Sequence, residues 1–252
     1  MPALYETLTA WYHLLDPLED HEDEARELSD LLIQAGAEPG GALLELGCGA
    51  GNNAFFLSRD WRCTLSDRSP QMLALSRAKN PGCEHALGDM RSLRLDRLFD
   101  VVLVHDAVCY LLSEAELAET AQTAFAHTRP GGVALFAPDC LVEGFCEWTE
   151  ESEASDALRT LRTLSWTWDP DPGDTVYAVE YALMMREGGE VRVVHDHHEE
   201  GLFPRSTWER VLGEAGFRVR VVERAEPDPN GLGYTRLVFL GLREGAEPGA
   251  TR

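Results

Sequence analysis

The middle of the chain alternates between short apolar runs and helical stretches. The runs occupy residues 42–46, 63–67, 83–87, 99–104 and 132–137. Runs of this length that alternate with helices are typical of buried strands in a parallel sheet covered on both faces. We therefore expect an α/β fold with a doubly wound, mostly parallel sheet.

The first forty residues carry a helical pattern instead. One helical face collects the large residues Leu4, Leu8, Trp11, Tyr12 and Leu15. A second helix is expected from about residue 20 to 35, and a third over 113–127, where Ser113 and Glu116 have the spacing of a capping box.

The alternation of strands and helices stops after Asp139. Residues 140–160 are acidic and are expected to form helix or loop. Strand-like segments then follow at 164–168, 175–186 and 191–198, joined by turns that contain Gly and Pro. We expect these segments to form an inserted antiparallel sheet.

The α/β pattern then resumes. Ser206 and Glu209 have the spacing of a second capping box, and strands are expected at 217–223 and 235–242. The expected divisions are a helical cap at 1–40, a core at 41–139 and 203–243, a lid at 140–202 and a flexible tail at 244–252.

The composition narrows the choice of partners. The formal net charge of −22 repels nucleic acid backbones, so nucleic acid is not expected as a substrate. The charge is explained by solubility or, alternatively, by attraction of a cationic acceptor such as an amine. The six cysteines show no Cys-x-x-Cys spacing, so neither a disulfide framework nor a zinc site is expected. Neither a membrane span nor a signal peptide is recognisable, and a cytoplasmic location is expected.

A glycine-rich turn, Glu45-Leu46-Gly47-Cys48-Gly49-Ala50-Gly51, follows the first core strand. Glycine lets the backbone turn sharply and approach a ligand closely, and the helix that follows offers free N–H groups. A dinucleotide site would place the third glycine one position later, and the acidic Glu45 would serve a pyrophosphate poorly. NAD is therefore disfavoured.

Polar residues follow three further core strands. Asp67 ends the second strand, Asp89 follows the third, and His105 ends the fourth. Ligands in open α/β sheets bind beyond the carboxyl ends of the strands, so these residues should converge on one crevice with the glycine turn. A carboxylate at the position of Asp67 can accept hydrogen bonds from both hydroxyls of a ribose.

In order and spacing, these segments resemble the class I S-adenosylmethionine-dependent methyltransferases. The resemblance spans Ala42 to Asp139 and rests on Glu45–Gly51, 66–73, Gly88-Asp89-Met90, 99–102 and 129–132. It implies a seven-stranded Rossmann-like sheet with an antiparallel last strand. It also implies S-adenosylmethionine as the cofactor and S-adenosylhomocysteine as the product.

The resemblance implies roles for the first matched motifs. Gly47, Gly49 and Gly51 would pass along the methionine part of the cofactor. Asp67 would bind the ribose hydroxyls, and its neighbour Arg68 is included among the cofactor-binding residues.

Further roles are implied for residues later in the pattern and for the cap. Met72 would pack against the adenine, Asp89 would accept a hydrogen bond from its amino group, and Met90 would donate a backbone N–H. His105 would lie near the transferred methyl group, and the segment with Tyr12 would close over the cofactor. The plainer alternatives are core packing for Met72 and Tyr12.

Methyl transfer from a sulfonium mainly requires alignment and the exclusion of water. An ammonium acceptor must first lose a proton, and a hydroxyl acceptor needs a base more strongly. His105 is the candidate catalytic base, with Tyr5 or Tyr12 as polar positioners. The alternative is that His105 only packs against the cofactor.

The lid is expected to cover a partly apolar site for a small-molecule amine or hydroxyl acceptor. Its aromatic surface would come from Trp148, Trp166, Trp168, Tyr177 and Tyr181. His195 and His197 share one side of a strand but have no recognisable third ligand, so no metal is expected.

The layout resembles that of small-molecule methyltransferases, including enzymes that N-methylate amino sugars and glycine-type amines. A non-catalytic module that binds S-adenosylmethionine to regulate a partner is the alternative function. The acceptor remains open, as does the choice between monomer and homodimer.

Overall fold

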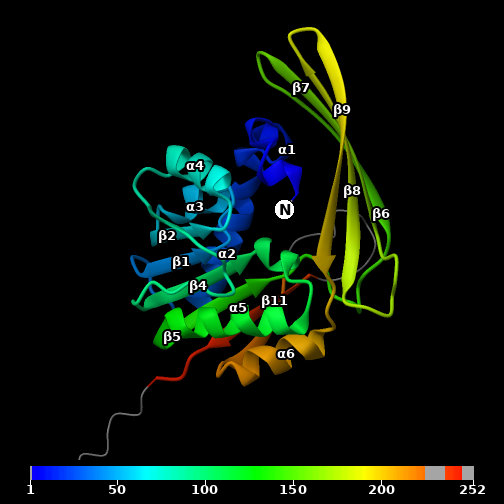
Figure 1. Ribbon diagram of the computed structural model, residues 1–252. Helices are drawn as coiled ribbons and strands as arrows, with labels where there is room; N and C mark the ends of the chain where they lie inside the picture. Colours follow the sequence, from blue (N-terminus) through cyan, green and yellow to red (C-terminus); the bar gives the residue numbers. More distant parts are fainter. Residues whose placement is uncertain (1, 225–235, 246–252) are drawn as a thin grey trace, which may run out of the picture.

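The computed structural model describes residues 2–224 and 236–245, which build two β-sheets (Figure 1). In spatial order, the larger sheet consists of β10 (Arg218–Glu223), β11 (Leu237–Leu242), β5 (Thr128–Ala137), β4 (Phe99–His105), β1 (Ala42–Leu46), β2 (Arg62–Asp67) and β3 (Glu84–Leu87). The smaller sheet consists of β6 (Trp148–Ser155), β7 (Arg159–Trp168), β8 (Val176–Glu187) and β9 (Glu190–Gly201).

The larger sheet is mostly parallel. Strands β5, β4, β1, β2 and β3 pair in parallel, whereas β11 pairs antiparallel with both β5 and β10. This arrangement confirms the expected seven-stranded Rossmann-like sheet with an antiparallel last strand.

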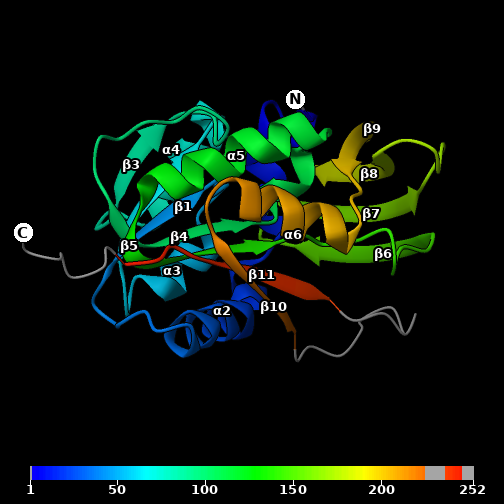
Figure 2. The ribbon, with the colours of Figure 1, turned by 90° about the horizontal axis from the view of Figure 1, so that it is seen from below.

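Helices cover both faces of this sheet (Figure 2), because successive apolar residues point to opposite sides. Leu43 and Val101 pack in one core cluster with residues of α2 (Glu22–Gln34) and α3 (Asn52–Leu57). Their neighbours Leu44 and Val102 pack in a second cluster with residues of α5 (Glu114–His127) and α6 (Arg205–Glu214). Helix α4 (Pro70–Lys79) lies beside β2 and β3.

The smaller sheet is the inserted antiparallel sheet that the sequence predicts, but it contains one more strand than expected. The prediction of helix or loop over 140–160 is wrong for β6, which pairs with β7 along its whole length. Most of β6 is exposed, including Glu150 and Glu151. Since β6 is an edge strand, acidic residues on it remain in water, and the apolar alternation that would reveal a strand is missing.

The first fifteen residues form short turns of helix where one continuous helix was predicted. These are η1 (Ala3–Tyr5), η2 (Thr9–Trp11) and α1 (Tyr12–Leu15). Leu4, Leu8, Trp11 and Leu14 pack against buried residues of β7 and β8. The N-terminal segment therefore lies between the core and the smaller sheet (Figure 1).

Of the two predicted capping boxes, the first forms a cap. The hydroxyl of Ser113 accepts a hydrogen bond from the Glu116 N–H at 3.3 Å. The second prediction is wrong, because α6 begins at Arg205 and Ser206 lies inside it. Across residues 2–224 and 236–245, the helices are too short or too polar to span a membrane.

Candidate active site

A cavity of about 390 Å³ opens where β1, β2 and β4 end. Its wall also includes residues of the N-terminal segment, of η4 (Ala107–Tyr110) and of β9. The sequence-predicted residues in the wall include Tyr5, Tyr12, Gly47, Gly49, Asp67, Arg68, Met72, Asp89, Met90 and His105. A cavity of this size, lined by segments distant in sequence, is typical of a small-molecule or cofactor site.

The glycine turn is held against β2 by backbone hydrogen bonds. The N–H groups of Gly47 and Cys48 both donate to the Ser66 carbonyl at 2.8 Å. Gly47 has a φ of +81°, and a Cβ there would overlap the Cβ of Ala107. The turn therefore requires glycine at position 47 for both its conformation and its space.

Gly51 differs from the other two glycines, because it is not part of the cavity wall. It precedes α3 with a φ of +73°, and its carbonyl accepts a hydrogen bond from Asn80 at 2.9 Å. A Cβ at this position would collide with Asn80 and would approach the Ser76 hydroxyl to 2.5 Å. The geometry gives Gly51 a packing role between α3 and α4.

Two carboxylates of the cavity wall, Asp67 and Asp89, lie at or just after the ends of β2 and β3. Asp67 accepts hydrogen bonds from the N–H groups of Gly49 at 2.8 Å and Ser69 at 2.7 Å. Burial raises the pKa of Asp67, against the lowering effect of these hydrogen bonds. Asp89 pairs with Arg91 at 2.7 Å, and the hydrogen bonds from Arg91 lower the pKa of Asp89.

Glu45 provides a direct test of whether the cavity suits a ligand that carries an ammonium group. Its side chain is buried in the cavity wall, and its Oε2 has no hydrogen-bond partner among the described residues. Burial raises the pKa of Glu45 to about 8. A buried, unpaired carboxyl oxygen is costly, and the ammonium of an amino acid would satisfy it. Glu45 therefore fits the ammonium group in the methionine part of S-adenosylmethionine.

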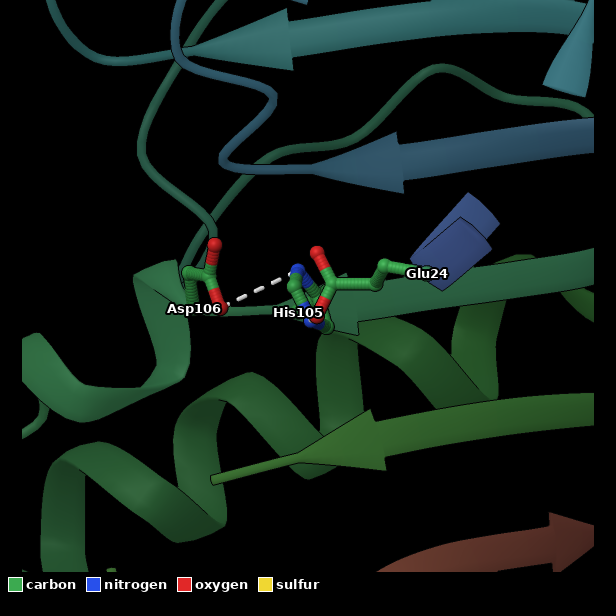
Figure 3. Close-up of side chains that lie close together, drawn as sticks. All are labelled: Glu24, His105 and Asp106. Carbon is green, nitrogen blue, oxygen red and sulfur yellow. Dashed lines mark hydrogen bonds and ion pairs between the residues drawn. The ribbon is translucent and has the colours of Figure 1, made fainter. Parts of the chain in front are cut away.

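His105 ends β4 between two carboxylates (Figure 3). Its Nε2 lies 3.0 Å from Glu24 Oε1 and its Nδ1 lies 3.1 Å from Asp106 Oδ1. Burial opposes the charged imidazole, but Asp106 and Glu24 outweigh it and raise the pKa of His105 well above its ordinary value. With both ring nitrogens occupied by carboxylates, His105 is poorly suited to accept a proton.

Asp106 has an unusual backbone. Its φ of +49° lies in the left-handed region that non-glycine residues rarely adopt. The carboxylate is half exposed in the cavity wall, and one of its oxygens pairs with His105. Glu24, His105 and Asp106 also have the spacing of metal ligands, but Arg224 lies 3.1 Å from Glu24 Oε1 and already supplies a positive charge.

The network around Glu24 is absent from the sequence-based prediction. Its Oε2 lies 3.7 Å from His21 Nδ1, and its Oε1 contacts His105 and Arg224. Burial alone would lower the pKa of His21, but the carboxylates of Asp16 and Glu24 favour its charged form and raise the pKa to about 10. Helix α2 carries no recognised motif, and only His21 directly before it and the acidic residues of its first turn are a usable signal.

The smaller sheet contributes less to the cavity than the sequence predicts. From β9, His197 and Glu199 lie in the wall, whereas the aromatic residues expected there do not belong to it. Tyr177 is buried against Phe145, and Trp166 is stacked on Trp168 with about half of its surface exposed. Because successive side chains of a strand point to opposite faces of the sheet, these aromatic side chains point either into the core or outward.

Three comparisons with known proteins agree with this architecture. A family model described as a methyltransferase domain matches residues 43–132. The chain is 28% identical to dTDP-3-amino-3,4,6-trideoxy-alpha-D-glucopyranose N,N-dimethyltransferase of Streptomyces venezuelae over 226 residues. The aligned region covers 88% of this chain and 91% of that protein.

Solved structures extend the likeness to nearly the whole chain. The structure of Streptomyces venezuelae DesVI is 26% identical with a TM-score of 0.79, covering 95% of this chain and 97% of that one. The S-adenosylmethionine-bound structure of CalS10, an amino pentose methyltransferase from Micromonospora echinaspora, is 23% identical with a TM-score of 0.78, covering 94% and 97%.

The Rossmann-like sheet, the glycine turn and the cavity at the strand ends define a small-molecule methyltransferase. Residues 43–132 match a methyltransferase domain, and over most of its length the chain is similar to methyltransferases that act on small molecules. It is an enzyme whose cofactor is S-adenosylmethionine, and the alternative of a non-catalytic binding module is set aside.

Proposed function

We propose that this enzyme methylates the amino nitrogen of an amino sugar carried on a nucleoside diphosphate. The relative from Streptomyces venezuelae, aligned over 88% of this chain, acts by its name on a dTDP-linked amino sugar, and this likeness carries the proposal. Beyond Glu45, the cavity wall carries the carboxylates of Asp106 and Glu199, which suit a cationic amine. Arg68 is a basic residue of the wall that would favour an anionic diphosphate.

Within this proposal, the cofactor takes the side of the cavity near β1 and β2. Gly47 and Gly49 leave room for its methionine part, and Glu45 pairs with the ammonium group. Asp67 binds the ribose hydroxyls with the lone pairs that Gly49 and Ser69 leave free. Arg68 and Tyr12 border this part of the cavity.

The adenine would lie between Met72, which is buried in α4, and the loop after β3. Asp89 accepts a hydrogen bond from the adenine amino group, and Met90 donates its backbone N–H to the ring. When bound, S-adenosylmethionine supplies an electrophilic methyl group on a sulfonium. Near the methyl group, His105 holds Glu24 and Asp106 in place and does not act as the base that deprotonates the acceptor.

The function is tested with purified enzyme, S-adenosylmethionine and a dTDP-linked 3-amino sugar. Mass spectrometry is expected to show the addition of one and then two methyl groups to the sugar, with S-adenosylhomocysteine as the coproduct. The matched control is the same nucleotide sugar with a hydroxyl in place of the amine, which is expected to remain unmethylated. Methylation of the hydroxyl sugar but not of the amino sugar would contradict the proposal.

The Gly47→Ala variant is expected to lose at least about tenfold in affinity for S-adenosylmethionine, because a Cβ overlaps Ala107 and distorts the turn. The matched control is Gly40→Ala. Gly40 has a similar φ of +84°, but a Cβ there meets no atom within 4 Å. Both variants should lose about 1–3 kcal/mol of stability from backbone strain. Equal loss of affinity in both, measured by calorimetric titration, would show that the clash with Ala107 is irrelevant.

A further inference from the structure

A continuous chain of hydrogen bonds leads from the cavity into the smaller sheet. The hydroxyls of Tyr5 and Tyr110, both in the cavity wall, lie 2.7 Å apart. The Tyr110 hydroxyl lies 2.9 Å from Nδ1 of His198 on β9. Nε2 of the same imidazole lies 3.3 Å from Asp196 Oδ2. Four side chains from three separate segments thus form one line.

The far end of this chain fixes its direction. Asp196 accepts hydrogen bonds from the backbone N–H groups of Ala3 at 3.0 Å and Leu4 at 2.9 Å. Since an ionised carboxylate only accepts, Nε2 of His198 must donate to it, and Nδ1 is left as an acceptor for the Tyr110 hydroxyl. Tyr110 can then accept from Tyr5, so every donor points away from the cavity.

We propose, resting on the amine acceptor of the proposed function, that this chain of hydrogen bonds is a proton relay. The relay takes the proton that the acceptor must lose before it can be methylated. The ammonium nitrogen gives a proton to the Tyr5 oxygen as Tyr5 passes its own proton to Tyr110 and Tyr110 passes its proton to Nδ1 of His198. The acceptor becomes a neutral amine, and His198 becomes an imidazolium paired with Asp196. Both tyrosines end as they began.

Methyl transfer then forms the new N–C bond as the C–S bond of the cofactor breaks. The free lone pair of the amine is the nucleophile, and the electrons of the broken bond remain on sulfur. The methylated amine leaves with its remaining protons, and His198 returns its proton to solvent. A second methylation needs the same proton removal again, so one relay serves both rounds.

The surroundings of His198 suit a group that is neutral at rest. Burial lowers the pKa of His198, against the raising effect of Asp196. Burial and the nearby carboxylate of Glu200 on β9 raise the pKa of both Tyr5 and Tyr110 well above the ordinary value, so each passes a proton on and does not remain ionised. The titratable and charged groups that face the imidazole are Asp196 and His197 on β9, Glu180 and Tyr181 on β8, Tyr110 on η4 and Tyr5 on η1.

The relay is tested with His198→Asn, whose amide keeps a hydrogen-bonding group near Nδ1 but cannot hold a proton, and with Tyr110→Phe. Each variant is expected to lose about 100-fold in kcat at pH 7 with a dTDP-linked amino sugar. The loss should shrink as the pH rises above the pKa of the acceptor amine. Affinity for S-adenosylmethionine should stay within about threefold of the wild type, a change of less than ~1 kcal/mol.

His195→Asn is the matched control, because His195 lies on the same strand but is exposed and pairs with Glu180 at 2.5 Å. It is expected to keep wild-type kcat at every pH. A merely structural role for His198 would lower kcat equally at all pH values, and that result overturns the relay. Nitrogen NMR of labelled histidine provides a readout without turnover: His198 should be neutral at pH 7 with its proton on Nε2, and a proton on Nδ1 overturns the relay.

The two proposals fail in different ways. If the wild type methylates the amino sugar and His198→Asn does so with the same pH profile, the relay is wrong and the proposed function stands. If the wild type methylates only the hydroxyl analogue, the proposed function is wrong and the relay falls with it.

Discussion

Replacing Asp67 by alanine is expected to weaken the binding of S-adenosylmethionine by about 1,000-fold. In the proposed complex this carboxylate accepts hydrogen bonds from the ribose hydroxyls, and bonds to a charged group contribute about 1.5–3 kcal/mol each. The same carboxylate fixes the glycine turn through the N–H of Gly49 at 2.8 Å. One substitution therefore removes ligand contacts and loosens the turn that surrounds the ligand.

The measurement is calorimetric titration with S-adenosylmethionine, accompanied by urea unfolding. Asp100→Ala is the matched control. Asp100 also accepts a backbone hydrogen bond, from Ala42 at 2.7 Å, but it lies at the start of β4, outside the cavity wall. The control should lose stability and keep its affinity. Comparable loss of affinity in the two variants would mean that general loosening of the sheet, and not the contact with ribose, explains the effect.

The core of this fold is readable from the sequence because its constraints are local. A buried parallel strand needs a short apolar run, and the turn after β1 needs glycine because a Cβ at Gly47 would overlap Ala107. Asp67 and Asp89 are recognisable because they lie at or just after the end of a strand, and strand ends converge at one edge of a sheet. These features appear in the sequence as spacing, and the structure brings them to one cavity.

The electrostatics of the cavity are not readable in the same way, because they depend on contacts between distant segments. His105 looks like a free histidine at a strand end until Glu24, 81 positions earlier, is brought to 3.0 Å from it. The line from Tyr5 to His198 likewise joins η1, η4 and β9. No local pattern marks such pairs, and the pKa of a buried group depends on all of its neighbours.

The aromatic lining of the lid was predicted from composition alone, and here the sequence is misleading. An antiparallel sheet has two faces, and composition does not say which one meets the cavity. Tyr177 and Tyr181 turn toward the core side, whereas Trp166 turns outward. The residues of the smaller sheet that do reach the cavity, His197 and Glu199, are polar and lie on the edge strand β9.

Replacing Glu24 by glutamine is expected to lower the free energy of unfolding by about 3 kcal/mol, because removing one partner of a buried charge pair leaves the others uncompensated. Glu24 is 18% exposed and lies between His105, His21 and Arg224. In a chain of this size, the corresponding fall in Tm is about 6–12 °C. The matched control is Glu22→Gln on the same helix, where a 55% exposed side chain pairs with Arg59. Its cost should stay below about 1 kcal/mol.

The pH dependence of stability gives this prediction a sharper form. The pKa of His105 is raised in the folded enzyme and that of His21 is raised to about 10, so their stabilising effect is complete below the unfolded value near 6.5 and is lost as the pH rises through the folded values. The pKa of Glu24 is lowered: despite burial, His105, His21 and Arg224 favour its ionised form. Its contribution is therefore present above its ordinary pKa of 4.5 and is lost as the pH falls through the lowered value.

Urea unfolding of the wild type should accordingly show a free energy that declines between about pH 6.5 and pH 9, as the unfolded state releases histidine protons that the native state keeps. In Glu24→Gln this decline should be shallower, because His105 and His21 lose one of their anions. It should not vanish, since Asp106 still faces His105 and Asp16 still faces His21 at 2.6 Å. An identical slope in wild type and variant would mean that the carboxylate of Glu24 does not hold these histidines in their charged form.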